Sequence, residues 1–197
     1  MLDIYLAALP SVYSEMPVYP PERQEVIDST KNRAVRRERY FVWRLLEYGV
    51  KKSLSKSVED IMPYISESGK WLSDSCYFSL AHTDGAVAVA ISDVPVGIDI
   101  ERERGIDIDA FSRRILTDSE RDALLTSPDK NQFLIEYWTK KESIYKMSGT
   151  PPFSPSKIEC SDYAVSTHRL NVANTEYFVS VCTEKSSDIK FEMVDLN

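Results

Sequence analysis

Pro95-Val-Gly-Ile-Asp-Ile-Glu101, near the middle of the chain, alternates aliphatic side chains with a glycine and two carboxylates. This alternation predicts a β-strand, because successive side chains of a strand point to opposite faces. Asp99 and Glu101 then share one face, with their Cα atoms about 6.5–7 Å apart. Two carboxylates this close repel each other unless a cation lies between them, and such oxygen ligands suit Mg²⁺.

Two interpretations of this acidic face stay open at this point. In the first, the face is a ligand site, and Gly97 leaves open space beside the carboxylates where a ligand could approach. In the second, the strand lies at the edge of a sheet, and its acidic face meets solvent. A bare Asp-x-Glu pattern does not distinguish them.

A second group of charged residues lies in Trp138-Thr-Lys-Lys-Glu-Ser-Ile-Tyr-Lys146, within a helix expected over residues 130–148. At 3.6 residues per turn, Glu142 and Lys146 lie together at the edge of a buried stripe. Lys141 falls inside that stripe, where a lysine is unexpected unless an anion meets it. An i,i+4 ion pair explains Glu142 and Lys146 but not Lys141. A site with one carboxylate ligand and two phosphate-facing lysines explains all three. The stripe consists of Leu134, Tyr137, Trp138, Ile144 and Tyr145.

Basic residues are concentrated in one part of a chain whose net charge is −7. Residues 31–56 contain nine Lys or Arg against only two acidic residues, Glu38 and Glu47. Apolar residues interspersed with the arginines predict one amphipathic helix over most of this stretch. Its basic face is either a solvated surface or a site for an anion, such as a phosphate or an acidic partner protein.

The remaining elements are short. Strands are expected at 2–8, 76–80, 86–91, 94–101, 175–183 and 188–195, with Gly69 and Lys70 in a turn and the last two strands forming a hairpin. Further helices are expected near 55–62, 107–116 and 118–126. The order of these elements predicts an α+β fold of two similar-sized, pseudo-symmetric lobes, residues 1–95 and 96–197, with a cleft between them.

Composition excludes several classes of protein. Apolar residues make up 43% of the 197 residues, which is enough for a core. The three cysteines, Cys76, Cys160 and Cys182, are few and far apart, so we expect neither a disulfide framework nor a zinc site, but a reducing cytoplasm. The net negative charge argues against nucleic-acid binding. No apolar run reaches the roughly 20 residues of a membrane span, and no signal peptide is indicated.

Two further residues are weak candidates. His82 is expected at the corner between a strand and a turn, where a single histidine is more often structural than functional. Thr117 or Ser119 could cap a helix, which makes Glu120 a first-turn acid of that helix. His168 suggests no role.

Taken in order, these pieces resemble the phosphopantetheinyl transferases of the surfactin-synthetase type. That family has an arginine-rich helix, a strand end with S-H-S/T, the motif G-[IV]-D-[IV]-E, an acid shortly before a helix, and W-x-x-K-E-[AS]-x-x-K. The counterparts here are Arg36 to Arg44, Ala81-His82-Thr83, Gly97 to Glu101, Glu120, and Trp138 to Lys146. The resemblance covers roughly residues 33–150.

The resemblance implies a monomeric, cytoplasmic enzyme with its active site in the cleft between the lobes. It implies Mg²⁺-dependent transfer of the 4′-phosphopantetheine group of coenzyme A to a serine of an acyl or peptidyl carrier protein. Mg²⁺ would be bound by Asp99, Glu101 and Glu142. Coenzyme A would be contacted by Arg37, Arg44, Lys70, His82, Thr83, Lys141 and Lys146, with Arg37 and Arg44 at its 3′-phosphoadenosine end. The catalytic base would be Glu142, with Glu120 as second choice.

Two positions depart from the family pattern. Ala81 replaces the family's serine before the histidine, and Arg23 is only a loose counterpart of its early lysine contacts. These departures concern the affinity for coenzyme A and leave the reaction type intact. Two other classes of protein stay in competition. One is another Mg²⁺-dependent phosphoryl-transfer or hydrolytic enzyme, and the other is a non-catalytic protein that binds coenzyme A or a carrier protein.

Overall fold

A computed structural model describes residues 1–149, 152–185 and 188–196. The helices are α1 (Pro21–Asp28), α2 (Arg33–Leu54), α3 (Val58–Ile61), α4 (Ile108–Ile115), α5 (Asp118–Thr126) and α6 (Lys130–Ser148). The strands are β1 (Leu2–Ala8), β2 (Tyr64–Ile65), β3 (Trp71–Leu72), β4 (Tyr77–Thr83), β5 (Ala86–Ser92), β6 (Val96–Arg102), β7 (Ala164–Val172), β8 (Thr175–Thr183) and β9 (Lys190–Met193). Short 3₁₀ turns follow α6 at Pro155–Lys157 and Cys160–Asp162.

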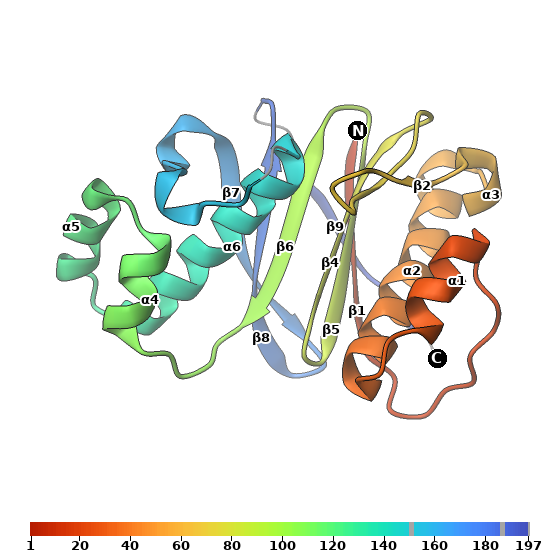
Figure 1. The fold of residues 1–197 in the computed structure, drawn as a ribbon, viewed down its shortest axis with the longest axis horizontal. Coiled ribbons are helices and arrows are strands. Elements are labelled where there is room, and N and C mark those ends of the chain that lie inside the picture. The colour runs from red at the N-terminus through yellow and green to blue at the C-terminus, as the bar shows by residue number, and fades with distance from the viewer. Residues whose placement is uncertain (150–151, 186–187, 197) are drawn as a thin grey trace.

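Two sheets form the centre of the molecule (Figure 1). The first has the strand order β4-β5-β1-β9, and the second has the order β6-β8-β7. Neighbouring strands are antiparallel, except that β9 runs parallel to β1. The strands β2 and β3 form a separate small hairpin beside the first sheet.

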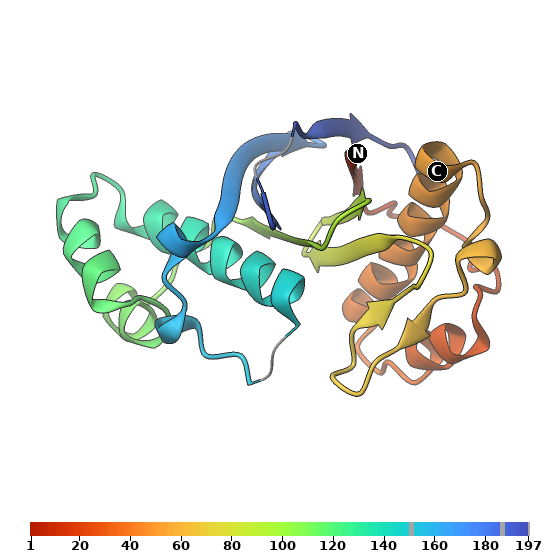
Figure 2. The same cartoon turned by 90° about the horizontal axis from the view of Figure 1, so that it is seen from above.

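Alternation along β5 explains how the layers stack. Val87, Val89 and Ile91 pack against α2, whereas the alanines between them pack against the second sheet. Each strand face therefore meets a different layer, as period-two patterning requires. The order of layers is helix, sheet, sheet, helix, with the strands between α2 on one side and α6 on the other (Figures 1 and 2). The predicted α+β class is confirmed.

The strand β6 has the alternation that its sequence predicts. Val96, Ile98 and Ile100 lie in the core between the two sheets. Gly97 and Asp99 lie on the opposite face, against α6. As the alternative interpretation expected, β6 is an edge strand of its sheet. Asp99 is only 7% exposed, however, so this part of the acidic face does not meet solvent.

The predicted C-terminal hairpin is wrong. The strand β8 pairs with β6 and β7, and β9 instead joins the first sheet beside β1. The actual hairpin is β7–β8, closed by Ala173 and Asn174, both with positive φ, as a two-residue hairpin turn requires. We missed β7 because its side chains are mostly half-buried, which removes the clean alternation that identifies a strand.

The chain crosses from the first sheet to the second between β5 and β6, and it returns to the first sheet with β9. A division at residue 95 and a pseudo-symmetry between the halves stay predictions. In the part of the chain that the structure describes, no helix combines the length and the apolar composition of a membrane span.

Helix α6 is held from its outer side by a buried ammonium group. Lys141 is 0% exposed, and its Nζ donates to Glu120 Oε2 at 2.5 Å and to the carbonyl oxygens of Pro155 and Ile158 at 3.0 and 2.7 Å. These contacts join α6 to α5 and to the segment that follows α6. The anion that meets Lys141 is thus the Glu120 carboxylate, which corrects the prediction that Lys141 faces phosphates.

The Glu120 carboxylate also has hydrogen bonds besides its ion pair with Lys141. Its carboxylate accepts from the backbone nitrogens of Thr117 and Cys160 at 2.9 and 3.2 Å, and it is the N3 residue of a capping box with Thr117. The capping interpretation of Glu120 is therefore confirmed. Because every contact of this 3% exposed side chain is structural, Glu120 is not available as a catalytic base.

Replacing Lys141 with Met should cost about 3–5 kcal/mol of unfolding free energy, because the Glu120 carboxylate would stay buried without its partner. Its sequence neighbour provides the control: Lys140 pairs with Glu136 near the surface, and Lys140→Met should cost less than about 1 kcal/mol. Urea unfolding of both variants measures the difference. Equal losses in the two variants would contradict the structural role of Lys141.

Candidate active site

A cluster of charged side chains lies where β6 meets α6. Lys146 Nζ donates to Asp99 Oδ1 at 2.7 Å, joining the two elements that carry the sequence motifs. Burial raises the pKa of Asp99 to about 7; the Lys146 ammonium lowers it, and the nearby Glu142 and Glu101 carboxylates raise it. Burial likewise raises the pKa of Glu142, opposed by Lys146. The structure therefore brings together the three carboxylates and the lysine that the sequence singled out.

Glu101 lies at the outer end of this cluster. Its Oε2 accepts from Thr83 Oγ1 at 3.0 Å and from Arg104 Nη1 at 2.6 Å. Thr83, which was expected to touch phosphate, instead connects β4 to the carboxylate on β6. The cluster is thus supported from β4, β6 and α6.

One buried atom of the cluster lacks a partner. Asp99 Oδ2 is inaccessible and accepts no hydrogen bond from the protein, although an unpaired buried oxygen is costly. A cation would satisfy it, and the carboxylate oxygens around it are the donors that Mg²⁺ prefers. Among the described residues, no three His, Cys, Asp or Glu side chains are already arranged closely enough to hold a metal ion. The case for a cation therefore rests on the orphaned oxygen and on the chemistry of the donors.

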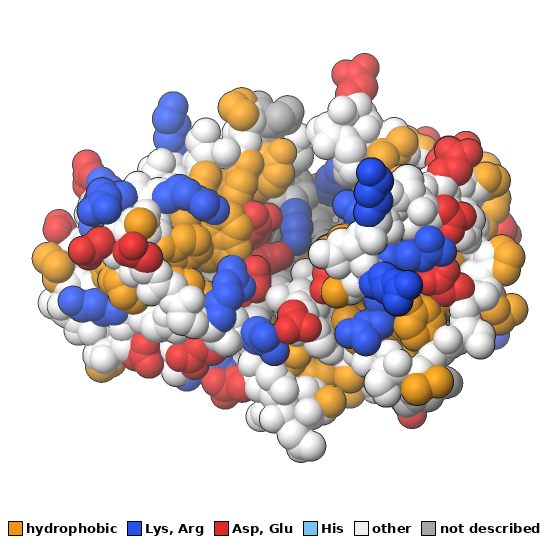
Figure 3. All heavy atoms as spheres, turned by 60° about the horizontal axis from the view of Figure 1, so that its bottom comes forward, with side chains coloured by type: hydrophobic (Ala, Val, Ile, Leu, Met, Phe, Trp, Pro, Cys, Tyr) orange, Lys and Arg blue, Asp and Glu red, His pale blue; other side chains and the backbone are white. Residues whose placement is uncertain are grey.

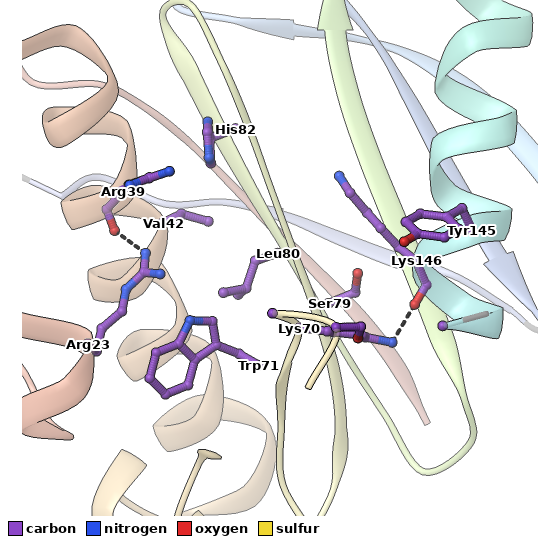
Figure 4. A pocket seen from close by; sticks show the side chains of 13 residues that line it. Arg23, Arg39, Val42, Lys70, Trp71, Ser79, Leu80, His82, Tyr145 and Lys146 are labelled. Atoms are coloured by element: carbon purple, nitrogen blue, oxygen red, sulfur yellow. Dashed lines mark hydrogen bonds between the residues drawn. The ribbon is translucent and has the colours of Figure 1, made fainter. Parts of the chain in front are cut away.

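A cavity of about 290 Å³ lies beside the cluster, between α2 and α6 and over β4 (Figure 4). Such a volume is near the lower end of the range of small-molecule sites. Basic side chains approach it from both sides: Arg23 and Arg39 from α1 and α2, and Lys70 and Lys146 from the β2–β3 hairpin and α6. On the surface, acidic side chains gather near the middle of this face, with Lys and Arg side chains on both sides of them (Figure 3).

Arg23 is the most unusual of these cations. It is 5% exposed, and within the described ranges it makes no ion pair with a carboxylate. Its guanidinium lies 4.7 Å from the ring centroid of Trp43 and donates to the carbonyl of Arg39, while its Nε is buried without a partner. Burial and the neighbouring Arg39 lower its pKa to about 10. A buried guanidinium with a free donor indicates an anion site.

The other titratable groups of the cavity indicate the same excess of positive charge. Burial lowers the pKa of His82 to about 4, helped by the charges of Lys146, Arg23 and Arg39. His82 is therefore neutral near pH 7, and its Nδ1 bonds Glu38 Oε2 at 2.9 Å. Burial and Lys146 together lower the pKa of Lys70, whose Nζ donates to the carbonyl of Lys146. A bound anion would relieve this mutual repulsion.

Two arginines predicted for this site lie elsewhere. Arg44 pairs with Glu47 and lines a separate cavity of about 480 Å³ on another side of α2. Arg37 does not line the 290 Å³ cavity either, although its Nε is buried without a partner. The sequence analysis missed Arg39, which occupies the cavity in their place. Helical geometry could have separated them, because residues five positions apart point about 140° away from each other.

The surroundings of Gly97 and Ala81 also differ from those that the sequence indicated. The open space predicted beside Gly97 does not exist, because the backbone of α6 fills it. Ala81, at the position of the family's serine, is 1% exposed and packs in the core between the sheets. A hydroxyl there would therefore point into the core rather than into the cavity.

This chain is similar in sequence to known proteins. One curated relative, "4'-phosphopantetheinyl transferase psf-1" of Bacillus pumilus, is 36% identical over 77 residues, covering 38% of this chain and 33% of the relative. Another, "4'-phosphopantetheinyl transferase gsp" of Aneurinibacillus migulanus, is 36% identical over 100 residues, covering 49% of this chain and 42% of the relative. The matched segments thus span less than half of each relative's length.

A solved structure, holo-[acyl-carrier-protein] synthase (AcpS) of Thermotoga maritima, aligns with a TM-score of 0.32 and 20% identity over 47% of this chain and 64% of that chain. The family model of the 4'-phosphopantetheinyl transferase superfamily matches residues 95–193, half of the chain, and this range includes Asp99, Glu101, Glu142 and Lys146. The chain therefore belongs to the 4′-phosphopantetheinyl transferase superfamily.

Proposed function

We propose that this chain transfers the 4′-phosphopantetheine group of coenzyme A to a serine of an acyl or peptidyl carrier protein, in a Mg²⁺-dependent reaction that releases adenosine 3′,5′-bisphosphate. The observation that carries this proposal is the position of Lys146. Its side chain lines the cationic cavity and also binds Asp99 in the carboxylate cluster. An anion-binding site and a candidate cation site therefore share one residue.

In this proposal the cavity holds the phosphates of coenzyme A. Lys70, His82 and Lys146 contact the pyrophosphate, and Arg23 and Arg39 bind the 3′-phosphoadenosine end in place of Arg37 and Arg44. Planar guanidinium groups suit a phosphate monoester, because they donate two parallel hydrogen bonds. His82, neutral in the free protein, would gain a proton beside the added negative charge.

The carboxylate cluster would hold the metal through Asp99, Glu101 and Glu142. When bound, Mg²⁺ would neutralise charge on the pyrophosphate and stabilise the negative charge that develops on the departing adenosine 3′,5′-bisphosphate. Asp99 Oδ2, which has no hydrogen-bond partner among the described residues, supports this assignment.

The reaction forms a bond between the serine Oγ of the carrier and the β-phosphorus of coenzyme A, and it breaks the bond to the bridging oxygen. Adenosine 3′,5′-bisphosphate takes the electron pair of that bond. Lys146 stabilises the developing charge as a preorganised donor. The serine proton goes to Glu142, whose pKa is raised by burial.

The remaining parts of the proposal concern partner and compartment. In this proposal the carrier protein belongs to fatty-acid, polyketide or nonribosomal-peptide synthesis. We infer a monomer that acts in the cytoplasm, where the free cysteines Cys76, Cys160 and Cys182 would stay reduced.

The direct test is the mass of a carrier protein after incubation with this chain, coenzyme A and Mg²⁺. A gain of one phosphopantetheine unit is expected.

Asp99→Asn, Glu101→Gln and Glu142→Gln should each abolish most of that gain while staying folded. Glu136→Gln, at a half-buried position of α6 where it pairs with Lys140, is the matched control and should retain activity. No mass gain with carriers of all three pathways would contradict the function, and hydrolysis of coenzyme A alone would favour the competing hydrolytic enzyme.

The reassigned arginine gives a second prediction. Arg39→Ala should raise the Michaelis constant for coenzyme A roughly tenfold or more, as loss of a charged hydrogen bond does, and should affect dephospho-coenzyme A much less. Arg44→Ala removes the same side chain from the same helix and should leave both constants near wild type. The opposite pattern would return the 3′-phosphate to Arg44.

Lys146 gives a third prediction. Lys146→Ala should lower kcat about a hundredfold or more, the scale for removing one preorganised charge-stabilising donor. Lys146→Arg should recover only part of the activity, because a planar fork replaces a compact ammonium. Transfer kinetics at saturating Mg²⁺ measure both, with Lys140→Ala as the control on the same helix. Full activity of Lys146→Ala would exclude its contact with the pyrophosphate.

A further inference from the structure

The backbones of β6 and α6 approach each other most closely at Gly97. A Cβ atom placed on Gly97 would lie 1.9 Å from the carbonyl oxygen of Ser143 and 2.5 Å from the backbone nitrogen of Met147. Gly97 is not among the glycines with positive φ, so its backbone conformation suits any residue. The glycine is needed here for space, not for conformational freedom.

The atoms that crowd Gly97 belong to the same turn of α6 as the charged cluster. Ser143 follows Glu142, and Met147 follows Lys146. On the strand, Asp99 is two residues from Gly97 and therefore on the same face. The 2.7 Å contact between Lys146 and Asp99 thus spans the gap that Gly97 keeps narrow.

We propose that Gly97 is a positioning residue: by letting the backbone of α6 lie directly on β6, it sets the separation between Glu142 and Lys146 on the helix and Asp99 and Glu101 on the strand. This proposal rests on the proposed function, because it assigns those four side chains to one site. The role of Gly97 then depends on its lack of a Cβ atom, which any other residue would add.

A methyl group at Gly97 cannot be accommodated by a side chain turning aside, since both crowded atoms are backbone. The helix must move away by a distance on the order of 1 Å, a displacement that can cost a catalytic site about a hundredfold in rate. Its outer side resists a uniform shift, because Lys141 ties α6 to α5 and to residues 155–158. The displacement should therefore be concentrated at the turn that carries Glu142 and Lys146.

The test compares Gly97→Ala with Gly105→Ala. An added Cβ at Gly105 meets no atom within 4 Å, and its φ is not positive, so the control adds the same methyl group without a clash. Both proteins are first checked for a cooperative thermal transition. Mn²⁺ binding to the folded protein is then measured by electron paramagnetic resonance, followed by kcat and the Michaelis constant for coenzyme A in carrier transfer.

For Gly97→Ala we expect Mn²⁺ affinity to fall at least about tenfold and kcat to fall about a hundredfold. The Michaelis constant for coenzyme A should change much less, because Arg23 and Arg39 approach from the side of the cavity away from α6. A general loosening of the fold would weaken all three together. Gly105→Ala should match wild type throughout.

Wild-type Mn²⁺ affinity and kcat in a folded Gly97→Ala protein would overturn the proposal. So would failure of this variant to fold even at low temperature, since the contact would then determine stability rather than the spacing of the site. Absence of transfer by the wild-type chain would instead contradict the proposed function, and Mn²⁺ binding would still report on Gly97.

Discussion

The contact between Asp99 and Lys146 is the interaction on which the site depends. Burial alone would protonate Asp99, since it raises the pKa of this carboxyl to about 7 even with Lys146 beside it. The ammonium group keeps a charged carboxylate tolerable at a position that is 7% exposed. Because Asp99 is on β6 and Lys146 is on α6, the same contact fixes the relative position of the two family motifs. One ion pair therefore joins the two elements and lies within the candidate site.

The second buried pair on α6 has a different role. Lys141 and Glu120 are fully enclosed, and both also bind backbone groups, so nothing is left over for a ligand. The pair of Lys146 and Asp99 has fewer contacts within the described residues. Lys146 lines a cavity, and one oxygen of Asp99 has no hydrogen-bond partner. A buried pair whose polar atoms all have hydrogen-bond partners is structural, whereas a pair with an unpaired polar atom indicates a place for a substrate or an ion. One helix therefore carries, five residues apart, a fully enclosed structural lysine and a lysine that lines the cavity.

The same five-residue spacing explains the arginines of α2. Arg39 faces the cavity, and Arg44 faces a different cavity of aromatic residues. The sequence analysis assigned both Lys141 and Lys146 to one site, and on α2 it chose Arg44 and missed Arg39. An α-helix rotates by about 140° over five residues, so two such side chains seldom reach the same ligand. Helical periodicity, applied more strictly, would have separated Lys141 from Lys146.

The amino-acid sequence by itself determined the α+β class, the alternation along β6, the bounds of α6 and the family. These follow from local periodicity and from the ordered motifs, which need no knowledge of distant contacts. Only the tertiary structure decided that α6 fills the space beside Gly97, that Glu120 is the anion of Lys141, that Arg23 and Arg39 line the cavity, and that β9 joins the first sheet. Each of these depends on which segment, far away in sequence, packs against a given face. The period of a strand or helix tells which side chains share a face, but the partner of that face is chosen by the packing of the whole chain.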